Sequence, residues 1–399
     1  MVALTAFLTL LSLLRVRGTG AIDTVWAEDG SRFFQQSLHA GALKLLITPY
    51  NGYLHLAPRL AVDVARLFPL PYFAAVIAVT GALISSGLAV FVYRASAGHL
   101  RSRLLQAAVA APLALTWVAQ SEVGNNVADA QWFLVYASFW AALYQGPDKR
   151  YRAVAVSVIF FAVASDPFAA VFIPLLRRKR AQAVGMAAGL LYQGIGIVFM
   201  GALSSRAAER EYDLPRSASA YLVHVVGHVL WPATGLWLVG AVFCAGLVAW
   251  TWRGLARSRA RITIAAFGYS ILIYFGLTIE GGFVAERYAY PAAALLLAGI
   301  AAAAAESGQG HRLLAGAVAV SVCWGWFGGG PDARLRAHSP SWRAQVRLAA
   351  ARCASSGSHR DAAAATTETE AATADVAIAP TGWKVHIPCS LLLRDVSGS

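Results

Sequence analysis

The chain is short of charged residues, and this shortage defines its class. Only 13% of the 399 residues are charged, whereas 58% are hydrophobic. A water-soluble globular protein is excluded, because so little charge leaves most of the sequence without a favourable place in water. The sequence therefore predicts an all-α polytopic membrane protein.

Other features are missing as well. The first apolar run, residues 2–14, has no basic segment before it and no Ala-x-Ala-like site after it. We therefore expect a retained first span in place of a cleaved secretory signal. Acidic residues are outnumbered by basic ones, 20 against 33, which gives a formal charge of +13. Loop topology and attraction to anionic lipid explain this charge better than nucleic-acid binding does.

About eleven apolar runs are candidates for membrane spans, each of which needs roughly 20 apolar residues to cross a hydrocarbon core of about 30 Å. They cover residues 2–14, 71–93, 104–119, 131–145, 153–165, 167–176, 182–204, 234–252, 262–279, 288–305 and 313–327. The sixth run is too short to cross alone. We expect it to be a half-helix that is broken from its neighbour at Asp166 and Pro167.

The arginines and lysines fall in alternate loops. The basic clusters lie at 94–103, 149–152, 177–180 and 253–261, followed by Arg312. The positive-inside rule makes these loops cytoplasmic. The opposite loops, which hold most of the unusual polar residues, are expected to face outward.

The first outward loop is long enough to have structure of its own. It covers residues 17–70 within a transmembrane module of residues 1–328. Apolar residues recur at helical spacing in two stretches, 31–47 and 53–68. We expect both to form amphipathic helices that lie along the membrane surface.

The second outward region is a small extracytoplasmic C-terminal tail, residues 329–399. An Ala/Thr/Glu-rich stretch at 361–375 indicates a flexible linker, and a short strand is expected within 376–390. Cys353 and Cys389 both fall in this tail. A disulfide bond between them is plausible in an oxidising compartment.

Two adjacent carboxylates follow the first span. Glu28 and Asp29 come after Trp26, a residue suited to the headgroup level, and before Gly30, which permits a tight turn. One interpretation is structural, with Asp29 beginning the next helix. The other is chemical, with one carboxylate acting as a general base toward a hydroxyl group or as a ligand to a divalent metal.

This arrangement resembles the GT-C superfamily of glycosyltransferases that use polyprenyl-phosphate sugars. The acidic pair in the first outward loop carries the resemblance, together with the surface helices and many spans that follow. Four short motifs are similar to those of bacterial members. They are Thr-Pro-Tyr-Asn-Gly-Tyr-Leu-His-Leu-Ala-Pro-Arg at 48–59, Asp-Ala-Gln-Trp at 129–132, Ser-Asp-Pro-Phe at 165–168 and Glu-Arg-Tyr-Ala-Tyr-Pro at 286–291.

The resemblance implies a GT-C-like fold and a catalytic role for Asp29 or Glu28. The carboxylate would deprotonate an acceptor hydroxyl as it attacks the anomeric carbon, with inversion and with lipid phosphate as the leaving group. It would act as a base or as a ligand to Mg²⁺ or Mn²⁺, with Asp29 as the candidate ligand. A second acidic site is not assigned, because several carboxylates compete for it: Glu122, Asp129, Asp166, Glu280 and Glu286.

Other polar residues in the outward loops are candidates for substrate binding. Arg287, beside Tyr288, can pair with the donor phosphate, and a snorkelling arginine is the alternative. Arg59 and His55 lie one turn apart and can face the same phosphate, although a solvated helix face would look the same.

Three further groups have two interpretations each. Asn125, Asn126, Asp129 and Gln131 form a dense polar set at a span entrance, suited to sugar hydroxyls or to an ordinary loop. Asp166 lies at a broken helix, where a carboxylate lines a cavity or caps the half-helix. His224 and His228 have metal-ligand spacing but lack the glutamate of a zinc protease, so an interfacial helix is favoured.

The sequence thus predicts a multi-pass protein of the bacterial cytoplasmic membrane with its active site on the outer face. It would transfer a sugar from a polyprenyl-phosphate carrier to a glycan, lipid or protein of the cell envelope. A transporter or flippase of lipid-linked sugars is the alternative. That class favours symmetric broken helices, and this chain has no internal repeat. An envelope scaffold would leave Asp29 and Asp166 without a role.

Overall fold

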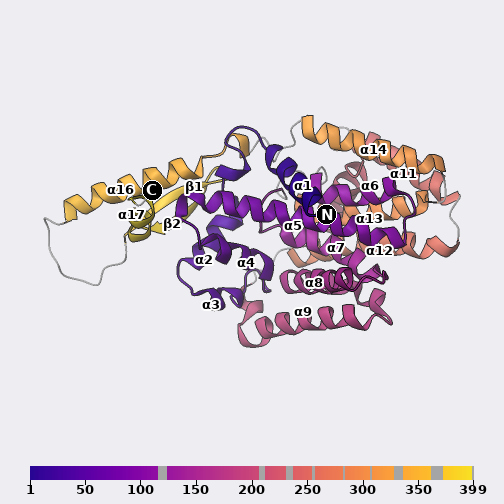
Figure 1. Ribbon diagram of the computed structural model, residues 1–399, viewed down its shortest axis with the longest axis horizontal. Coiled ribbons are helices and arrows are strands. Elements are labelled where there is room, and N and C mark those ends of the chain that lie inside the picture. Colours follow the sequence, from indigo (N-terminus) through magenta and orange to yellow (C-terminus); the bar gives the residue numbers. More distant parts are fainter. Residues whose placement is uncertain are drawn as a thin grey trace.

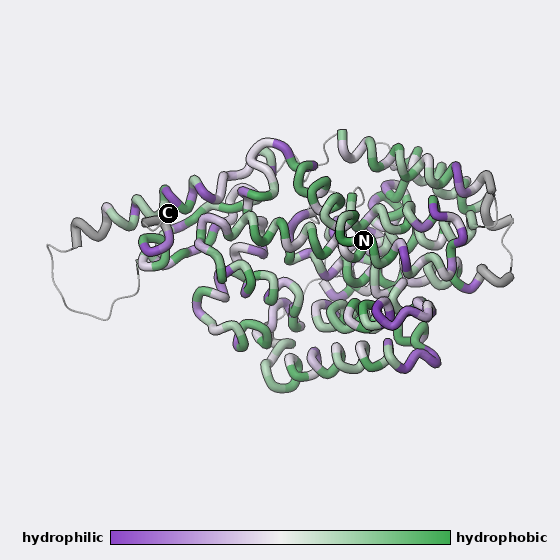
Figure 2. The backbone as a smooth tube through the Cα atoms, in the orientation of Figure 1, coloured by the Kyte–Doolittle hydropathy of each residue, from purple (hydrophilic) through white to green (hydrophobic). Residues whose placement is uncertain are grey.

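The computed structural model describes residues 1–115, 124–205, 212–230, 237–253, 257–281, 284–305, 308–327, 336–360 and 372–397. The chain is mostly helical, with a bundle of roughly aligned helices at one end and a smaller unit that contains two strands at the other (Figure 1). Hydrophobic residues dominate the bundle, whereas hydrophilic residues gather on α16 and on turns at the ends of the bundle helices (Figure 2). This distribution is that of a membrane protein.

The bundle is built from ten long helices among the described residues. They are α1 (Val2–Leu14), α5 (Phe73–Ala95), α6 (Arg103–Leu115), α7 (Ala130–Leu143), α8 (Lys149–Ser165), α9 (Arg180–Phe199), α11 (Trp237–Arg253), α12 (Arg257–Gly281), α13 (Glu286–Ala304) and α14 (Gly308–Phe327). Shorter helical segments join them: η4 (Ser96–Gly98), η5 (Pro167–Leu176), η6 (Ala202–Ser205), α10 (Leu214–Ala220) and η7 (Tyr221–Gly227).

Among the described residues, four segments are long and apolar enough to cross a bilayer. They are Leu70–Ser96, Arg180–Phe199, Arg261–Gly281 and Glu286–Ala304. Five shorter apolar helices accompany them: Val2–Leu14, Arg103–Leu115, Ala130–Leu143, Pro167–Leu176 and Trp237–Ala249. The prediction of a helical membrane protein is confirmed, and the lengths of the described helices establish four candidate spans.

Helices α7 and α13 form the centre of the bundle. Every residue of α7 up to Ala142, and every residue of α13 from Tyr288 onward, is buried. The Phe133 and Tyr290 rings meet edge to face, with centroids 4.9 Å apart. The many alanines of α13 let neighbouring helices approach closely, as small residues do in membrane bundles.

The expected break after α8 is present. Asp166 is extended, with φ −153° and ψ 111°, and its Oδ1 accepts a hydrogen bond of 2.8 Å from the backbone N–H of Phe168. The next ten residues form the 3₁₀ helix η5 instead of continuing α8. Pro167 at the start of η5 cannot donate a backbone hydrogen bond, which favours the change of helix.

The smaller unit combines the first long loop with the C-terminal segment, and we call it the head (residues 17–72, 336–360 and 372–397). Its elements are η1 (Ala21–Asp23), η2 (Asp29–Phe34), α2 (Gln35–Ser37), α3 (Ala42–Leu46), α4 (Leu56–Ala65), η3 (Leu70–Tyr72), α16 (Trp342–Arg360), β1 (Thr373–Ile378), β2 (Trp383–Pro388) and α17 (Cys389–Ser397).

One hydrophobic core unites the two parts of the head. The Phe34 ring lies 4.2 Å from that of Phe73 and 6.1 Å from that of Trp342, measured between centroids. Trp342 is fully buried, and its indole N–H donates to the backbone oxygen of Leu70 at 2.8 Å. The C-terminal segment is therefore packed against the first loop and does not hang free.

The first loop differs from the two continuous helices that its sequence predicts. The stretch 31–47 is interrupted at residues 38–41, between α2 and α3. It also begins with the π-helix η2. The second helix, α4, starts at Leu56 and not at residue 53, because residues 50–53 form a tight turn in which Asn51 has a φ of 52°.

The tail also departs from its predicted layout. Residues 373–375, expected to be linker, belong to β1, and most of the predicted linker lies outside the described residues. In place of one strand there is an antiparallel hairpin, in which Val376 pairs with Val385. Both valines are fully buried against the first loop, and this burial explains why the segment pairs instead of remaining flexible.

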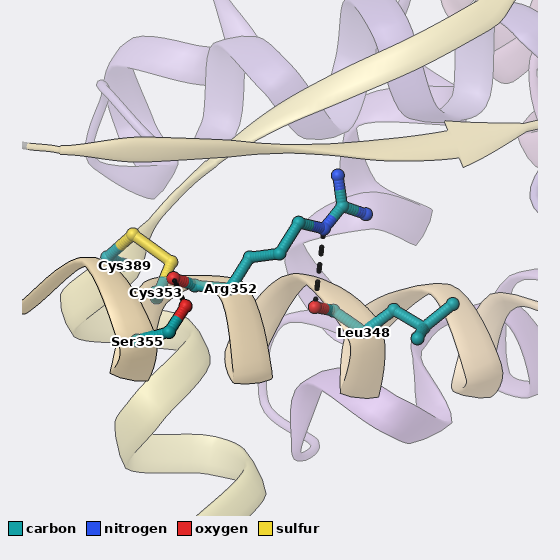
Figure 3. Close-up of a disulfide and its surroundings, with 5 residues drawn as sticks. All are labelled: Leu348, Arg352, Cys353, Ser355 and Cys389. Carbon is teal, nitrogen blue, oxygen red and sulfur yellow. Dashed lines mark hydrogen bonds between the residues drawn. A yellow bond between two sulfur atoms is a disulfide. The ribbon is translucent and has the colours of Figure 1, made fainter.

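A disulfide bond joins Cys353 of α16 to Cys389, the first residue of α17 (Figure 3). The two Cα atoms are 5.5 Å apart, within the usual range for such bonds. It closes a segment with a sequence separation of 36, for which a stabilisation of roughly 2 to 4 kcal/mol is typical. The hairpin is thereby tied to α16.

Close packing between α12 and α13 gives a test of the bundle. A side chain added at Gly299 would overlap the Phe267 ring, whereas Gly268 has open space around it. We expect Gly299→Val to lower stability by about 1–3 kcal/mol through overpacking. Gly268→Val is the matched control, and thermal unfolding in detergent is the measurement. Equal midpoints for the two variants would contradict this packing.

Candidate functional site

The two adjacent carboxylates of the first loop have different surroundings. Asp29 is fully buried, and its Oδ1 accepts hydrogen bonds from the backbone N–H groups of Val127 at 3.2 Å and Ala128 at 2.8 Å. Glu28 is half-buried and lines a cavity at the head end of the bundle. Asp29 therefore supports the loop that precedes α7, and Glu28 is the member of the pair that ligands can reach.

Burial raises the pKa of Asp29 to about 7. The N–H groups of Ala128 and Val127 and the charge of Arg336 oppose this effect, because each favours the ionised carboxylate. The guanidinium of Arg336 also lies over the Trp26 ring, 5.0 Å from its centroid. Asp29 is thus surrounded by protein groups, including Val127, Ala128 and Arg336, and it has no exposed surface.

Glu28 and Asp29 lie where the π-helix η2 begins. Asp29 begins this element, in which the backbone is wider than in an α-helix. Gly30 follows, and a side chain there would meet Ile378 Cδ1 at 2.7 Å and Val385 Cγ2 at 3.0 Å. The absence of a side chain at Gly30 lets the segment lie close to the C-terminal hairpin.

The cavity has a volume of about 60 Å³ and is partly open to solvent. Its walls come from the first loop, the start of α7 and the facing ends of α12 and α13. The lining residues are Glu28, Phe33, Tyr50, Asn51, Tyr53, His55, Ala128, Asp129, Gln131, Trp132, Leu277, Glu280, Gly281, Arg287 and Tyr288.

His55 lies in an aromatic and polar part of this wall. Its ring stacks on Tyr53 with centroids 4.2 Å apart, and its two nitrogens are 3.1 Å from Gln131 Oε1 and 3.0 Å from the backbone oxygen of Tyr50. Burial lowers the pKa of His55 to about 3, and the nearby charge of Arg59 adds to this effect. His55 is therefore neutral near pH 7 and serves as a hydrogen-bonding group.

Asp129 is held in place by its neighbours. Its Oδ1 accepts from the indole N–H of Trp132 at 2.9 Å, and its Oδ2 accepts from the side-chain amide of Asn126 at 2.9 Å. The backbone N–H of Asp129 donates to Asn126 Oδ1 at 2.8 Å. These bonds fix the carboxylate and the Trp132 ring at the start of α7, where both face the cavity.

The opposite wall carries a positive charge and a further carboxylate. Arg287 lies 5.7 Å from the centroid of the Tyr288 ring, and that ring meets Trp132 edge to face at 5.5 Å. Glu280 lies at the end of α12 and also lines the cavity. The cavity therefore combines three carboxylates, one guanidinium and several aromatic rings.

Several sequence-predicted residues are brought together here and others are not. Those that line the cavity are Glu28, His55, Asp129, Gln131, Arg287 and Tyr288. Asp29, Arg59, Asn126 and Asp166 are buried outside its lining. Asn125 is also used structurally, because its side-chain amide donates to the backbone oxygen of Ser12 at 2.9 Å.

Arg59 is not on a solvated helix face, as one interpretation of the sequence expected. It is fully buried, its Nη2 donates to Gln36 Oε1 at 3.0 Å, and its guanidinium lies 5.4 Å from the centroid of the Phe33 ring. Burial lowers its pKa to about 10, so it remains charged near neutral pH. It lies behind the cavity wall and acts on His55 through its charge.

The histidine pair lies apart from this site. The His224 and His228 rings are 5.7 Å apart between centroids, and both belong to or border the π-helix η7. Neither residue lines the cavity. Among the described residues, no group of three or more His, Cys, Asp or Glu side chains is placed to hold a metal ion.

Sequence reasoning gave no individual role to four aromatic cavity residues, Phe33, Tyr50, Tyr53 and Trp132, and it named Glu280 only as one of several candidates for a second acidic site. Tyr50 and Tyr53 belong to the polar and aromatic stretch 48–59, and Trp132 to the set that starts at Asp129. Clusters of aromatic residues beside polar ones were the available signal. Phe33 gave no such signal, because it reads as part of an amphipathic helix.

The arrangement has the character of a binding site for a polar organic ligand. Aromatic rings supply apolar faces, and a few charged and amide groups fix the orientation of a ligand, as in most small-molecule sites. Comparison with known proteins finds no family model, no curated protein and no solved structure that matches this chain.

The structural role of Asp29 is testable without knowledge of the ligand. Asp29→Ala removes the acceptor of two buried N–H groups, each of which costs about 1–3 kcal/mol when left unsatisfied. Asp29→Asn keeps one side-chain oxygen and is expected to lose much less. Asp63→Ala, which removes an ion pair with Arg66, is the control. Thermal unfolding measures the difference, and a midpoint for Asp29→Ala equal to that of the control would refute this role.

Proposed function

We propose that the chain is a GT-C-like glycosyltransferase that moves a sugar from a polyprenyl-phosphate carrier to a glycan, lipid or protein of the cell envelope. In this proposal about eleven helices span the bacterial cytoplasmic membrane, and the head and its cavity lie on the outer face. Glu28 carries the proposal, because it is the accessible carboxylate of the acidic pair and faces a cavity with aromatic and charged walls.

Glu28 would act as the general base. The acceptor hydroxyl attacks the anomeric carbon, its proton passes to the Glu28 carboxylate, and the bond between that carbon and the phosphate oxygen breaks. The phosphate leaves with the electron pair, and the sugar is inverted. A carboxylate placed within hydrogen-bond reach of the reacting hydroxyl contributes about 10²- to 10⁴-fold in such steps.

The remaining walls have matching roles in this scheme. Arg287 would pair with the negative charge that the donor phosphate already carries when it binds, a task suited to a planar guanidinium. The rings of Tyr53, Trp132 and Tyr288 would cover the apolar faces of the sugar, while Asp129 and Gln131 accept or donate hydrogen bonds to its hydroxyls. Asp129 is suited to this because its neighbours already fix its position.

Divalent cations such as Mg²⁺ and Mn²⁺ prefer oxygen ligands. Glu28, Asp129 and Glu280 supply carboxylate oxygens on the walls of one cavity, but the three are not grouped closely enough to hold such an ion together. Asp29 fits less well, because its oxygens accept backbone hydrogen bonds. A bound cation would neutralise phosphate charge. The steps proposed above use only side chains of the protein, such as Glu28 and Arg287.

The acidic pair supplies the first functional test. Membranes with the wild-type chain, Glu28→Gln or Asp29→Asn are supplied with radiolabelled polyprenyl-phosphate sugars at matched expression. We expect Glu28→Gln to lower transfer at least 100-fold, and Asp29→Asn to remain within about tenfold of wild type.

Two results would count against this scheme. Loss of transfer in Asp29→Asn alone would exchange the roles of the two carboxylates. If the wild type consumes no carrier across a broad donor panel with native acceptor membranes, the transferase proposal fails. Transport of lipid-linked sugars across vesicles is then the function to measure.

Arg287 gives a second functional test. Arg287→Gln removes a charged hydrogen bond to the donor, worth about 1.5–3 kcal/mol, so KM for the carrier should rise by about 10- to 100-fold. Arg216→Gln is the matched control, because Arg216 is exposed on α10 and lies outside the cavity lining. Steady-state kinetics over a range of donor concentrations measures KM. An unchanged KM in Arg287→Gln would remove Arg287 from the donor site.

A further inference from the structure

The segment that carries Glu28 is bonded to the C-terminal hairpin. The backbone N–H of Ala27 donates to the oxygen of Ala379 at 2.5 Å, and the N–H of Ala379 donates to the oxygen of Val25 at 2.9 Å. Trp26 and Ala379 thus form a parallel bridge. Residues on both sides of this bridge are buried, so water does not replace these bonds readily.

A second contact lies eight residues further along the chain, at Gln35. The Gln35 side chain donates to the backbone oxygen of His386 at 3.0 Å and accepts from its backbone N–H at 2.7 Å. The amide group of Gln35 therefore pairs with the free edge of β2 in the way that a neighbouring strand would. Between the two contacts, Gly30 packs on Ile378 and Val385.

The hairpin is itself anchored to the rest of the head. The disulfide bond joins Cys389, directly after β2, to α16 (Figure 3). The start of α16 is fixed to the first loop, because Ser341 Oγ donates to Asp23 Oδ2 at 2.5 Å and the backbone N–H of Arg343 donates to Asp23 Oδ1 at 3.1 Å. On the opposite side, Asp29 holds the Glu28 segment against Ala128.

We infer that the C-terminal hairpin is a positioning element of the site: it holds residues 25–30 against the bundle so that Glu28 faces the cavity. Its catalytic consequence rests on the proposed function. Gln35 and Ala379 are positioning residues, since they act on Glu28 through the backbone, and the Cys353–Cys389 bond keeps the hairpin docked. Arg287, Glu280 and His55 come from α13, α12 and the segment just before α4, and they take no part in these bonds.

Hydrogen–deuterium exchange of the full-length protein tests the docking directly. The Ala27 amide is bonded to Ala379 and buried, so undocking of the hairpin should reduce its protection from exchange. We expect Gln35→Ala, Cys353→Ser with Cys389→Ser, and wild type treated with reductant to exchange at this amide at least tenfold faster than untreated wild type. Gln145→Ala and Cys323→Ser are matched controls in the bundle and should exchange as wild type.

Turnover measured on the same samples tests the positioning role. We expect kcat to fall at least tenfold in the undocked proteins, with KM for the polyprenyl-phosphate sugar changed less than threefold, because Arg287 and His55 remain in place. Gln35→Glu keeps the bond from the His386 N–H and should recover part of both effects. A protein that is only destabilised would contain fewer active molecules. Its loss of activity would follow the fraction of unfolded protein and not the exchange at the Ala27 amide.

The outcomes separate the two proposals. Unchanged exchange at Ala27 in all three undocked proteins overturns the positioning element, and so does faster exchange with wild-type kcat. If the wild type shows no transfer, the proposed function fails while exchange still decides whether the hairpin holds residues 25–30. Faster exchange together with lower kcat supports both.

Discussion

Buried backbone N–H groups need acceptors, and the loop before α7 obtains one from Asp29. The bonds from Val127 and Ala128 place this carboxylate inside the protein and fix the distance between the first loop and the centre of the bundle. The start of α7, with Asp129 and Trp132, is positioned by the same contact. Without that acceptor, the wall formed by the first loop and the wall at the start of α7 would no longer be held against each other.

Because of this constraint, the adjacent carboxylates Glu28 and Asp29 have different surroundings. Asp29 has a shorter side chain and sits at the beginning of a π-helix, where it reaches the N–H groups of the adjacent loop. Glu28, one residue earlier, is left half-buried at the cavity. An acidic pair therefore does not imply two equivalent catalytic groups. One carboxylate organises the backbone, and the other lines the cavity.

The sequence predicted the membrane class, the break at Asp166 and the location of the acidic pair, because each depends on local composition. It also suggested the pairing of Cys353 with Cys389, which the structure joins. It did not distinguish Glu28 from Asp29, since that distinction depends on Val127 and Ala128, far along the chain. The burial of Arg59 and the strand that replaces part of the linker have the same origin in long-range packing.

The contact between Gln35 and His386 joins residues 351 positions apart in the sequence. A ribosome completes the acidic segment long before it makes the hairpin that docks on it, so the site is assembled late in biosynthesis. During that interval the cavity lacks one of its supports. The head is therefore complete only after the C-terminal segment has been translated and its two cysteines have been joined.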